Sequence, residues 1–162
     1  MSEKPTVELP IRRIAVRIRV GEHILSASDD PLFLGLRGPA GREFRLAYKH
    51  GKSLQRGGED RFVLGDPDDP ETNVAHPELN DPTSSVLDAA GIDSIFLRKG
   101  FEPIPNVRAV GEMDDRLEIV EADVEIHVEG RPKPIRHERR GPVWLGLVCG
   151  LRFELPPAND GS

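Results

Sequence analysis

Apolar and polar side chains alternate along three stretches of this chain, and this pattern constrains the fold more than any other feature. The stretches are residues 13–20, 122–128 and 145–155. In the first, every second residue from Ile14 to Val20 is apolar. The alternate positions include Arg13, Arg17 and Arg19. A period of two is typical of a strand with one buried and one solvated face. The alternation therefore predicts strands that line a core on one side only.

Shorter strand candidates lie at residues 32–36, 43–46, 61–64 and 92–97. Gly-Pro, Gly-Gly, Asp-Pro and Pro-Asn pairs stand between the runs, and these favour turns because glycine supplies positive φ and proline fixes φ. Many short strands without a long helical period predict an all-β fold, namely a two-sheet antiparallel β-sandwich of about eight strands.

The length of 162 residues suits one domain. We expect the sandwich to cover residues 12–155. Residues 1–11 and 156–162 are polar and contain proline, so we expect a flexible N-terminal tail and a flexible C-terminal tail.

Residues 66–90 form an acidic insertion with seven acidic side chains, four prolines and no basic residue. Because proline cannot donate to a sheet ladder, we expect a long surface loop here. One helical turn is expected near residues 84–90, with Ser84 or Ser85 as its cap. A long loop inside a compact domain often carries function, and a solvated insertion without function is the alternative.

Charge and composition argue against several classes of protein. The formal net charge is −6, which disfavours general nucleic-acid binding because phosphates would be repelled. No apolar run approaches the length of a transmembrane segment, and the N-terminal residues lack the pattern of a signal peptide, so we expect a cytoplasmic protein. The single cysteine, Cys149, lies in an apolar strand pattern, and we expect a small core residue there rather than a reactive thiol.

Motifs for catalysis are weak. Gly51-Lys52-Ser53 resembles part of a nucleotide-binding loop, but Leu46 stands where that motif needs its first glycine. The five histidines lack the spacing of paired zinc ligands, and no G-x-S-x-G serine motif is present. We expect a protein that is not an enzyme, and an uncharacterised hydrolase built from converging carboxylates is the alternative.

Five basic residues lie close together between two expected strands. They predict an anion-binding site on a loop tip, suited to the phosphate of a lipid headgroup. The alternative is a solvated hairpin that offsets the acidic surface. The five residues are Arg131, Lys133, Arg136, Arg139 and Arg140.

The segment LQRGGEDRFVLG, residues 54–65, resembles the PLAT domain (polycystin, lipoxygenase, alpha-toxin). In that family a turn with glycine and aspartate precedes a strand with an aromatic residue, as Gly57, Asp60 and Phe62 do here. Other segments resemble the family in the same order, so the resemblance covers residues 12–155. These segments are IAVRIRVG, SDDPLFLGLRGPAGREFRL, IDSIFLRKG, RLEIVEADVEI and VWLGLVCGLRFEL.

The resemblance implies an eight-stranded, non-catalytic sandwich that docks on membranes or on protein partners, sometimes with calcium at one end. The chain departs from the family's pattern at Arg116, where the family usually has tryptophan. The calcium ligands that it implies are Asp29 and Asp30 from one loop and Asp114 and Asp115 from another, since calcium prefers several oxygen ligands. For the first pair, the alternative is a turn closed by local hydrogen bonds ahead of Pro31.

Two functions remain open at this point. A binding module for a lipid headgroup or a protein partner would use exposed aromatic residues at its loops, and Phe101 and Trp144 are the candidates. The alternative for both is packing against a sheet edge. The other function is a structural subunit, such as a homo-oligomer, with no lipid or metal role. Its polar strand faces would pair with each other or across an interface, through Arg13, Arg17, Arg19, Asp123 and Glu125.

Overall fold

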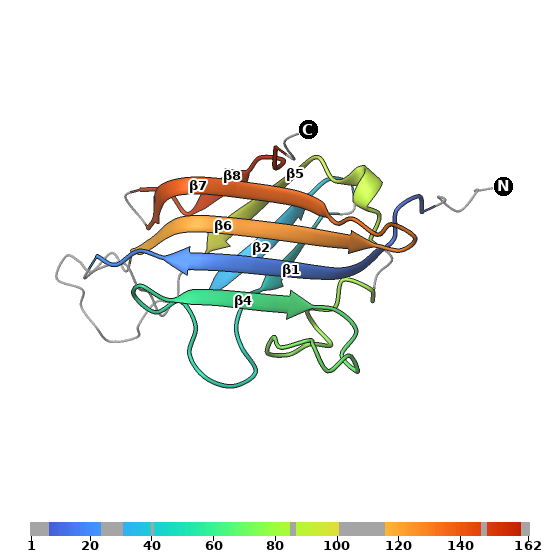
Figure 1. The fold of residues 1–162 in the computed structure, drawn as a ribbon, viewed down its shortest axis with the longest axis horizontal. Coiled ribbons are helices and arrows are strands. Elements are labelled where there is room, and N and C mark those ends of the chain that lie inside the picture. The colour runs from blue at the N-terminus through green and yellow to red at the C-terminus, as the bar shows by residue number, and fades with distance from the viewer. Residues whose placement is uncertain are drawn as a thin grey trace.

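Eight strands and one short 3-10 helix make up the regular structure (Figure 1). The computed structural model describes residues 7–23, 31–39, 41–84, 87–100, 116–146 and 149–159. Its strands are β1 (Ile11–Val20), β2 (Leu32–Arg37), β3 (Arg42–Arg45), β4 (Glu59–Leu64), β5 (Ser94–Lys99), β6 (Leu117–Val128), β7 (Ile135–Leu145) and β8 (Arg152–Leu155). The helix η1 (Ala89–Gly91) lies before β5, and within these residues no helix is long and apolar enough to cross a membrane.

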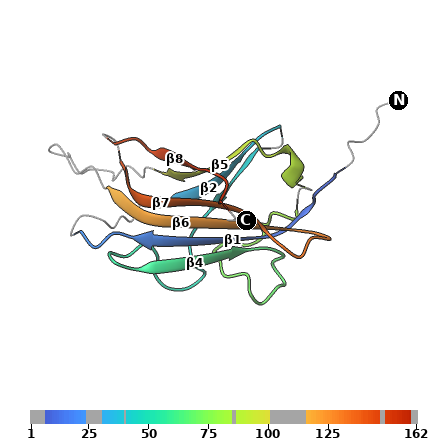
Figure 2. The same ribbon diagram turned by 45° about the horizontal axis from the view of Figure 1, so that its top comes forward.

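The strands form two antiparallel four-stranded sheets that face each other. The first sheet has the order β4-β1-β6-β7 and the second has the order β3-β2-β5-β8. Figure 2 shows β8, β5 and β2 as a layer above the first sheet. The prediction of a two-sheet antiparallel sandwich of about eight strands is therefore confirmed.

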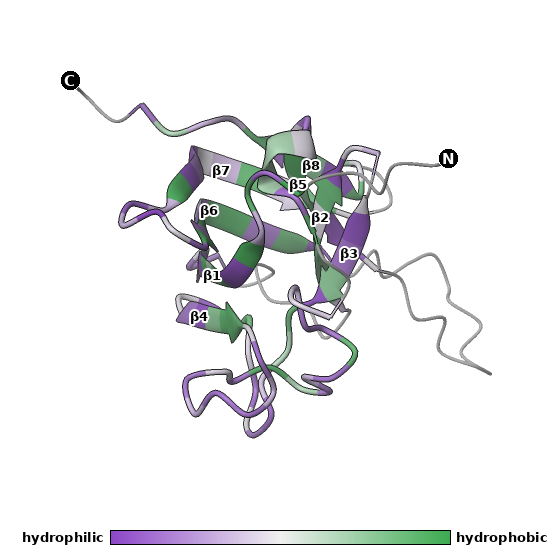
Figure 3. Ribbon diagram, turned by 90° about the vertical axis from the view of Figure 1, so that its right-hand side faces the viewer, coloured by the Kyte–Doolittle hydropathy of each residue, from purple (hydrophilic) through white to green (hydrophobic). Residues whose placement is uncertain are grey.

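The core lies between the sheets and is built by the alternation in the sequence. Ile14, Val16 and Ile18 are fully buried, and Phe44 and Phe62 fill the core from the second and first sheet. Burial of each such side chain stabilises the fold by about 1.5–3 kcal/mol. Figure 3 shows the two layers side by side, with hydrophobic and hydrophilic residues alternating along the strands.

The last two strands differ from the prediction. β7 includes most of the segment predicted as a basic loop, and the strand predicted at residues 145–155 is divided into the end of β7, a turn and β8. Gly146 and Gly150 close this turn with two backbone hydrogen bonds of 2.9 and 3.0 Å. Cys149 lies in the turn and is exposed, so the prediction of a core cysteine is wrong.

The acidic insertion covers one edge of each sheet, at β4 and at β3. The Asn73 side chain accepts a hydrogen bond from the Val63 N–H and donates one to the Arg61 carbonyl, both of 2.8 Å, as a neighbouring strand would do for β4. The Asn80 side chain accepts a hydrogen bond of 2.8 Å from the Arg45 N–H on β3. The described part of the insertion is thus tied to the sandwich, and its asparagines satisfy edge groups that would otherwise be free to pair with another chain.

The helical turn in the insertion forms later than predicted. It is the helix η1, and its cap is Asp88, whose side chain accepts a hydrogen bond of 2.9 Å from the Ala90 N–H. Ser84 lies before the helix and donates to a backbone carbonyl, so it is not the cap. Ser85 is outside the described residues.

The segment after β8 lies along β7. The Glu138 N–H donates to the Pro156 carbonyl at 3.0 Å, and the Ala158 N–H donates to the Arg136 carbonyl at 2.9 Å. These bonds hold the beginning of the predicted C-terminal tail on the outer edge of β7. Flexibility of the remaining tail residues stays a prediction.

Candidate functional site

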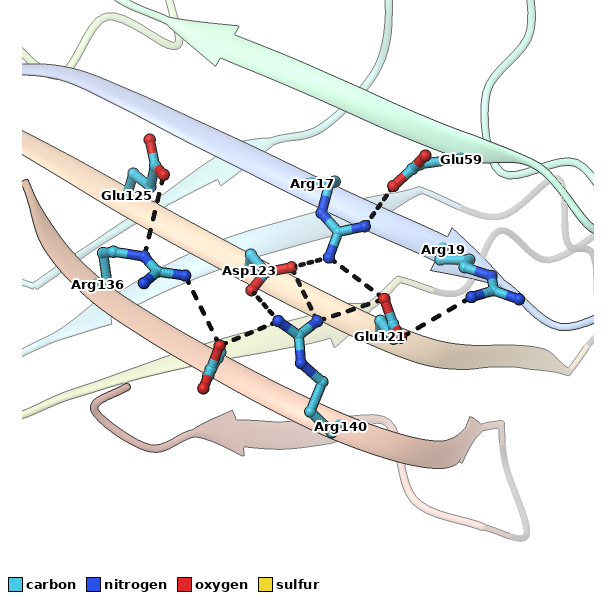
Figure 4. Close-up of polar contacts among 9 residues, drawn as sticks. Arg17, Arg19, Glu59, Glu121, Asp123, Glu125, Arg136 and Arg140 are labelled. Atoms are coloured by element: carbon cyan, nitrogen blue, oxygen red, sulfur yellow. Dashed lines mark hydrogen bonds and ion pairs between the residues drawn. The ribbon is translucent and has the colours of Figure 1, made fainter. Parts of the chain in front are cut away.

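Charged side chains cover the outer face of the first sheet. The cross-strand register places Arg17 on β1 opposite Asp123 on β6. Asp123 lies opposite a second carboxylate, Glu138 on β7, and Arg140 contacts both of them. We call this group the arginine–carboxylate network (Figure 4). It consists of Arg17, Arg19, Glu59, Glu121, Asp123, Glu125, Arg136, Glu138 and Arg140.

Asp123 is the centre of the network. It accepts a hydrogen bond from Arg17, and Arg140 reaches its two oxygens at 3.1 and 3.2 Å. Its side chain is only 11% exposed, so these bonds replace most of its water. The hydrogen bond from Arg17 to Glu59, followed by those to Asp123 and Glu121, raises the pKa of the Arg17 guanidinium. The expected pairing of the polar strand faces is confirmed for Arg17 and Asp123. Arg13, by contrast, pairs with Asp69 and Glu71 of the acidic insertion.

A shallow groove of about 280 Å³ runs across the network. Four arginines line it, Arg61 among them, and the other three, Arg17, Arg136 and Arg140, each contact at least one carboxylate. Their charge is therefore compensated within the protein, which weakens the attraction of an external anion. The arrangement suits a hydrated protein surface better than a catalytic or anion-binding centre.

The structure divides the predicted anion site between three places. Arg131 and Lys133 are exposed in the turn between β6 and β7. Arg136 and Arg140 lie on β7 and belong to the network. Arg139 has its guanidinium 5.5 Å from the ring centroid of the phenylalanine in β8. The prediction of one basic loop tip is wrong, because most of this segment is an extended strand.

One end of the sandwich collects four connections between the sheets. At this end β1, β3, β5 and β7 finish and β2, β4, β6 and β8 begin. We call it the loop end. Its connections are residues 21–31, 46–58, 100–116 and 146–151.

Trp144 lies on β7 at the loop end and is half-buried. The centroid of its ring is 5.7 Å from that of His23 in an edge-to-face arrangement, and the Arg116 guanidinium is 6.0 Å from the Trp144 ring centroid. Arg116 stands where the PLAT family usually has tryptophan, and here the neighbouring strand supplies the indole. The structure thus places Trp144 beside the connections from which a docking surface would be built.

Lys99 is a residue of the loop end that the sequence analysis did not single out. It lies at the end of β5, opposite Leu32, and is only 1% exposed. A fully buried lysine is rare because its charge must leave water. The sequence indicates this burial, because Lys99 follows Ile95 and Leu97 at alternate positions and so lies on the same face of the strand.

The predicted calcium ligands Asp29, Asp30, Asp114 and Asp115, together with Phe101, lie outside the described residues. Within the ranges that the structure describes, no group of three or more histidine, cysteine or acidic residues could hold a metal ion. Calcium binding therefore stays a prediction from the sequence.

Comparison with known proteins agrees with this architecture. No protein-family model matches the chain, and no curated protein matches its sequence. Among solved structures, it is similar to the alpha-toxin of Clostridium absonum with a TM-score of 0.57 at 12% identity, over 90% of this chain and 31% of the toxin. The Clostridium perfringens alpha-toxin matches with a TM-score of 0.58 at 12% identity, over 94% of this chain and 33% of the toxin.

A coral 8R-lipoxygenase also matches, with a TM-score of 0.53 at 10% identity, over 90% of this chain and 17% of the enzyme. Its published description refers to calcium activation through a C2-like domain. The chain has the PLAT fold. It spans about a third of each toxin and about a sixth of the lipoxygenase.

The PLAT fold explains the residues that carried the resemblance. Asp60 is buried, and its carboxylate accepts a hydrogen bond of 2.8 Å from the Leu54 N–H, which closes the turn before β4. Phe62 is fully buried in the core, and Gly57 adopts a φ of 69°. These three residues therefore stabilise the fold.

Proposed function

We propose that this chain is a non-catalytic PLAT module that docks on lipid surfaces through its loop end. The observation that carries the proposal is Trp144, which lies half-buried at that end between His23 and Arg116. Tryptophan suits the boundary between water and lipid because it combines a large apolar ring with one polar N–H group. Full burial of such a side chain contributes about 1.5–3 kcal/mol or more to binding.

The arginine–carboxylate network supports the loop end as the docking surface. It compensates charge on the outer face of the first sheet, which leaves that face hydrated. The similarity to alpha-toxins and to a lipoxygenase with a C2-like domain agrees with a lipid-directed role. Cytoplasmic location and the absence of catalysis are parts of the proposal.

The experiment is co-sedimentation of the protein with phosphatidylcholine vesicles and with vesicles that also contain phosphatidylserine. Wild-type protein should pellet with vesicles, Trp144→Ala should pellet much less, and Trp144→Phe should retain part of the binding. Leu79→Ala is the control, because it removes an exposed apolar side chain from the acidic insertion, away from the loop end. Absence of wild-type protein from every pellet would contradict the proposal and favour the protein-interaction subunit.

Calcium is a separate part of the proposal. Asp29, Asp30, Asp114 and Asp115 supply oxygen ligands of the kind that calcium prefers. Millimolar calcium should raise the melting temperature of the wild-type protein by binding to the native state, and Asp29→Ala should abolish the rise. Unchanged melting of the wild type with calcium would remove the metal from the proposal and leave lipid docking to be judged by the vesicles.

A further inference from the structure

The connection between β3 and β4 is basic and has no carboxylate. We call residues 46–58 the basic loop; Figure 1 shows it in teal, projecting below β4. Its cations Lys49, Lys52 and Arg56 are exposed, in a protein whose net charge is −6. A positive segment on an acidic protein attracts anions locally, because nearby charges act more strongly than distant ones.

A small cavity lies between the basic loop and the beginning of β2. Its volume is about 200 Å³. Arg45, Lys52 and Ser53 supply charged and polar groups, while Leu32 and Leu46 supply part of its apolar lining. Within the described residues neither Arg45 nor Lys52 forms an ion pair, in contrast to the compensated arginines of the network.

The backbone of the basic loop adds donors at the same place. The N–H groups of Gly51, Lys52 and Ser53 donate no hydrogen bond to any residue that the structure describes. The nearest N–H groups that donate are those of Lys49, which donates to Asn73, and of Leu54, which donates to Asp60. The N–H of His50, like those of the run itself, donates to no residue that the structure describes. Successive free N–H groups in a turn form a concave site for anions.

The loop is held in place at one end of this run, at Leu54. Gly51 adopts a φ of 87°, which glycine reaches without strain. Leu54 adopts a φ of 60° although it is not glycine, and it is held there by burial of its side chain and by its bond to Asp60. The end of the run next to Ser53 is therefore positioned before a ligand arrives, which lowers the entropic cost of binding there.

We propose that the cavity of the basic loop binds one phosphate group, with Arg45 and Lys52 as counter-ions and Ser53 and the loop amides as hydrogen-bond donors. A nucleotide is excluded as the natural ligand, because the cavity is smaller than the pockets of about 300–1,000 Å³ that hold such molecules and a strand follows the loop instead of a helix. The phosphate comes from a lipid headgroup, and this part of the inference rests on the proposed docking at the loop end.

The first test uses inorganic phosphate and nuclear magnetic resonance, with chloride at equal ionic strength as the reference. The amide signals of Gly51, Lys52 and Ser53 should move in a saturable way. The double variant Arg45→Gln/Lys52→Gln should bind at least about tenfold more weakly, since each charge-assisted hydrogen bond makes a large contribution to affinity.

The matched control is Lys49→Gln/Arg56→Gln, which removes the same charge from the same loop outside the cavity lining. It should retain most of the affinity. Equal loss of affinity in both double variants, or no saturable movement in the wild type, would overturn the site.

The second test uses vesicles of phosphatidylcholine with and without phosphatidic acid, which distinguishes a lipid source from free phosphate. Phosphatidic acid should increase pelleting of the wild type and of the control variant, but not of Arg45→Gln/Lys52→Gln. If the wild type pellets and both double variants respond equally to phosphatidic acid, the headgroup assignment fails while the proposed docking stands. If phosphate binds in solution but no vesicle is bound, the proposed docking fails while the phosphate site stands.

Discussion

Asp123 is the most buried carboxylate of the arginine–carboxylate network. Two arginines from different strands bind its carboxylate, and its own side chain is nearly excluded from water. Removal of the carboxylate leaves Arg17 and Arg140 with Glu121 as their one remaining shared counter-ion among the described residues. Asp123 is therefore a link between β1, β6 and β7.

Asp123→Ala should lower the free energy of unfolding by about 1–2 kcal/mol, a range reduced because the two arginines are partly exposed to solvent. Chemical denaturation measures the change. Glu154→Ala is the control, because its partner Arg37 is 3.8 Å away and both side chains are more than half exposed. The control should cost less than about 0.5 kcal/mol, and equal effects of the two substitutions would contradict the role of Asp123.

Asp88 ties the N-terminal segment to the sandwich. Its carboxylate accepts hydrogen bonds from the backbone N–H groups of Glu8 and Leu9 at 3.0 and 2.9 Å, and a third from Ala90. The bonds from these N–H groups, that of Glu8 first, lower the pKa of Asp88 from its ordinary value of 3.8. These hydrogen bonds favour the charged carboxylate. They therefore stabilise the folded protein fully when the pH is above 3.8, where the Asp88 carboxylate is charged.

Acid should therefore release the N-terminal segment only as the pH falls below 3.8 and through the folded-state pKa. Hydrogen exchange of the Glu8 and Leu9 amides against pH measures the release. Asp88→Asn should raise their exchange at neutral pH. Slow exchange of both amides in Asp88→Asn at neutral pH would show that the carboxylate does not hold the segment.

The residues of the binding surfaces were less predictable than the core. Inward positions such as Val16 and Ile18 follow from the period of two, because burial acts on every second residue. Pairing between the charged faces that hold Arg17 and Asp123 was predicted. The second contact of Asp123, with Arg140, depends on the register of three strands. The cavity at Arg45 and Lys52 depends on how a loop folds back on a strand, which has no periodic signal in the sequence.

At the scale of elements, six strands follow the predicted alternation or lie within a few residues of the predicted range, while β7 was missed. β7 is an edge strand, and its positions opposite the inward-facing Val124 and Ala122 hold His137 and Arg139. An edge strand meets water on more than one side, so its alternation is weaker. The short β8 was merged with the end of β7, because both strands and their turn are apolar.

The acidic insertion functions as an edge cover for β3 and β4. Asn73 satisfies two backbone groups of β4 with its side chain, and its own N–H donates to the Val63 carbonyl at 3.2 Å. An open edge strand invites pairing with a second molecule, so a cover of this kind keeps the sandwich separate. Its acidic side chains keep the outer surface hydrated.

Asn73→Ala should lower the free energy of unfolding by about 1–2 kcal/mol, because it leaves the Val63 N–H and the Arg61 carbonyl without their partner. The same variant should self-associate more readily, as measured by light scattering. Glu78→Ala is the control on an exposed position of the same insertion. If Asn73→Ala has the same stability and the same light scattering as the wild type, the covering role is contradicted.

At the scale of the whole molecule, the compensated face and the covered edges support the loop end as the proposed surface for recognition. The outer face of the first sheet has compensated charges, β3 and β4 are covered by the insertion, and β7 is covered by the segment after β8. The loop end presents Trp144 on one side and the basic loop on the other. This arrangement combines an apolar anchor with a site for phosphate, which together suit the surface of an anionic membrane.

Trp144 is the single tryptophan of the chain, so its fluorescence reports on the loop end without any label. The most direct measurement is its emission with vesicles of phosphatidylcholine and phosphatidic acid, including vesicles whose lipid chains carry a bromine quencher. Docking through the loop end predicts a blue shift with plain vesicles and quenching with brominated ones. Emission that stays unchanged while the protein pellets with the same vesicles would show that another surface binds the lipid, and would contradict the account.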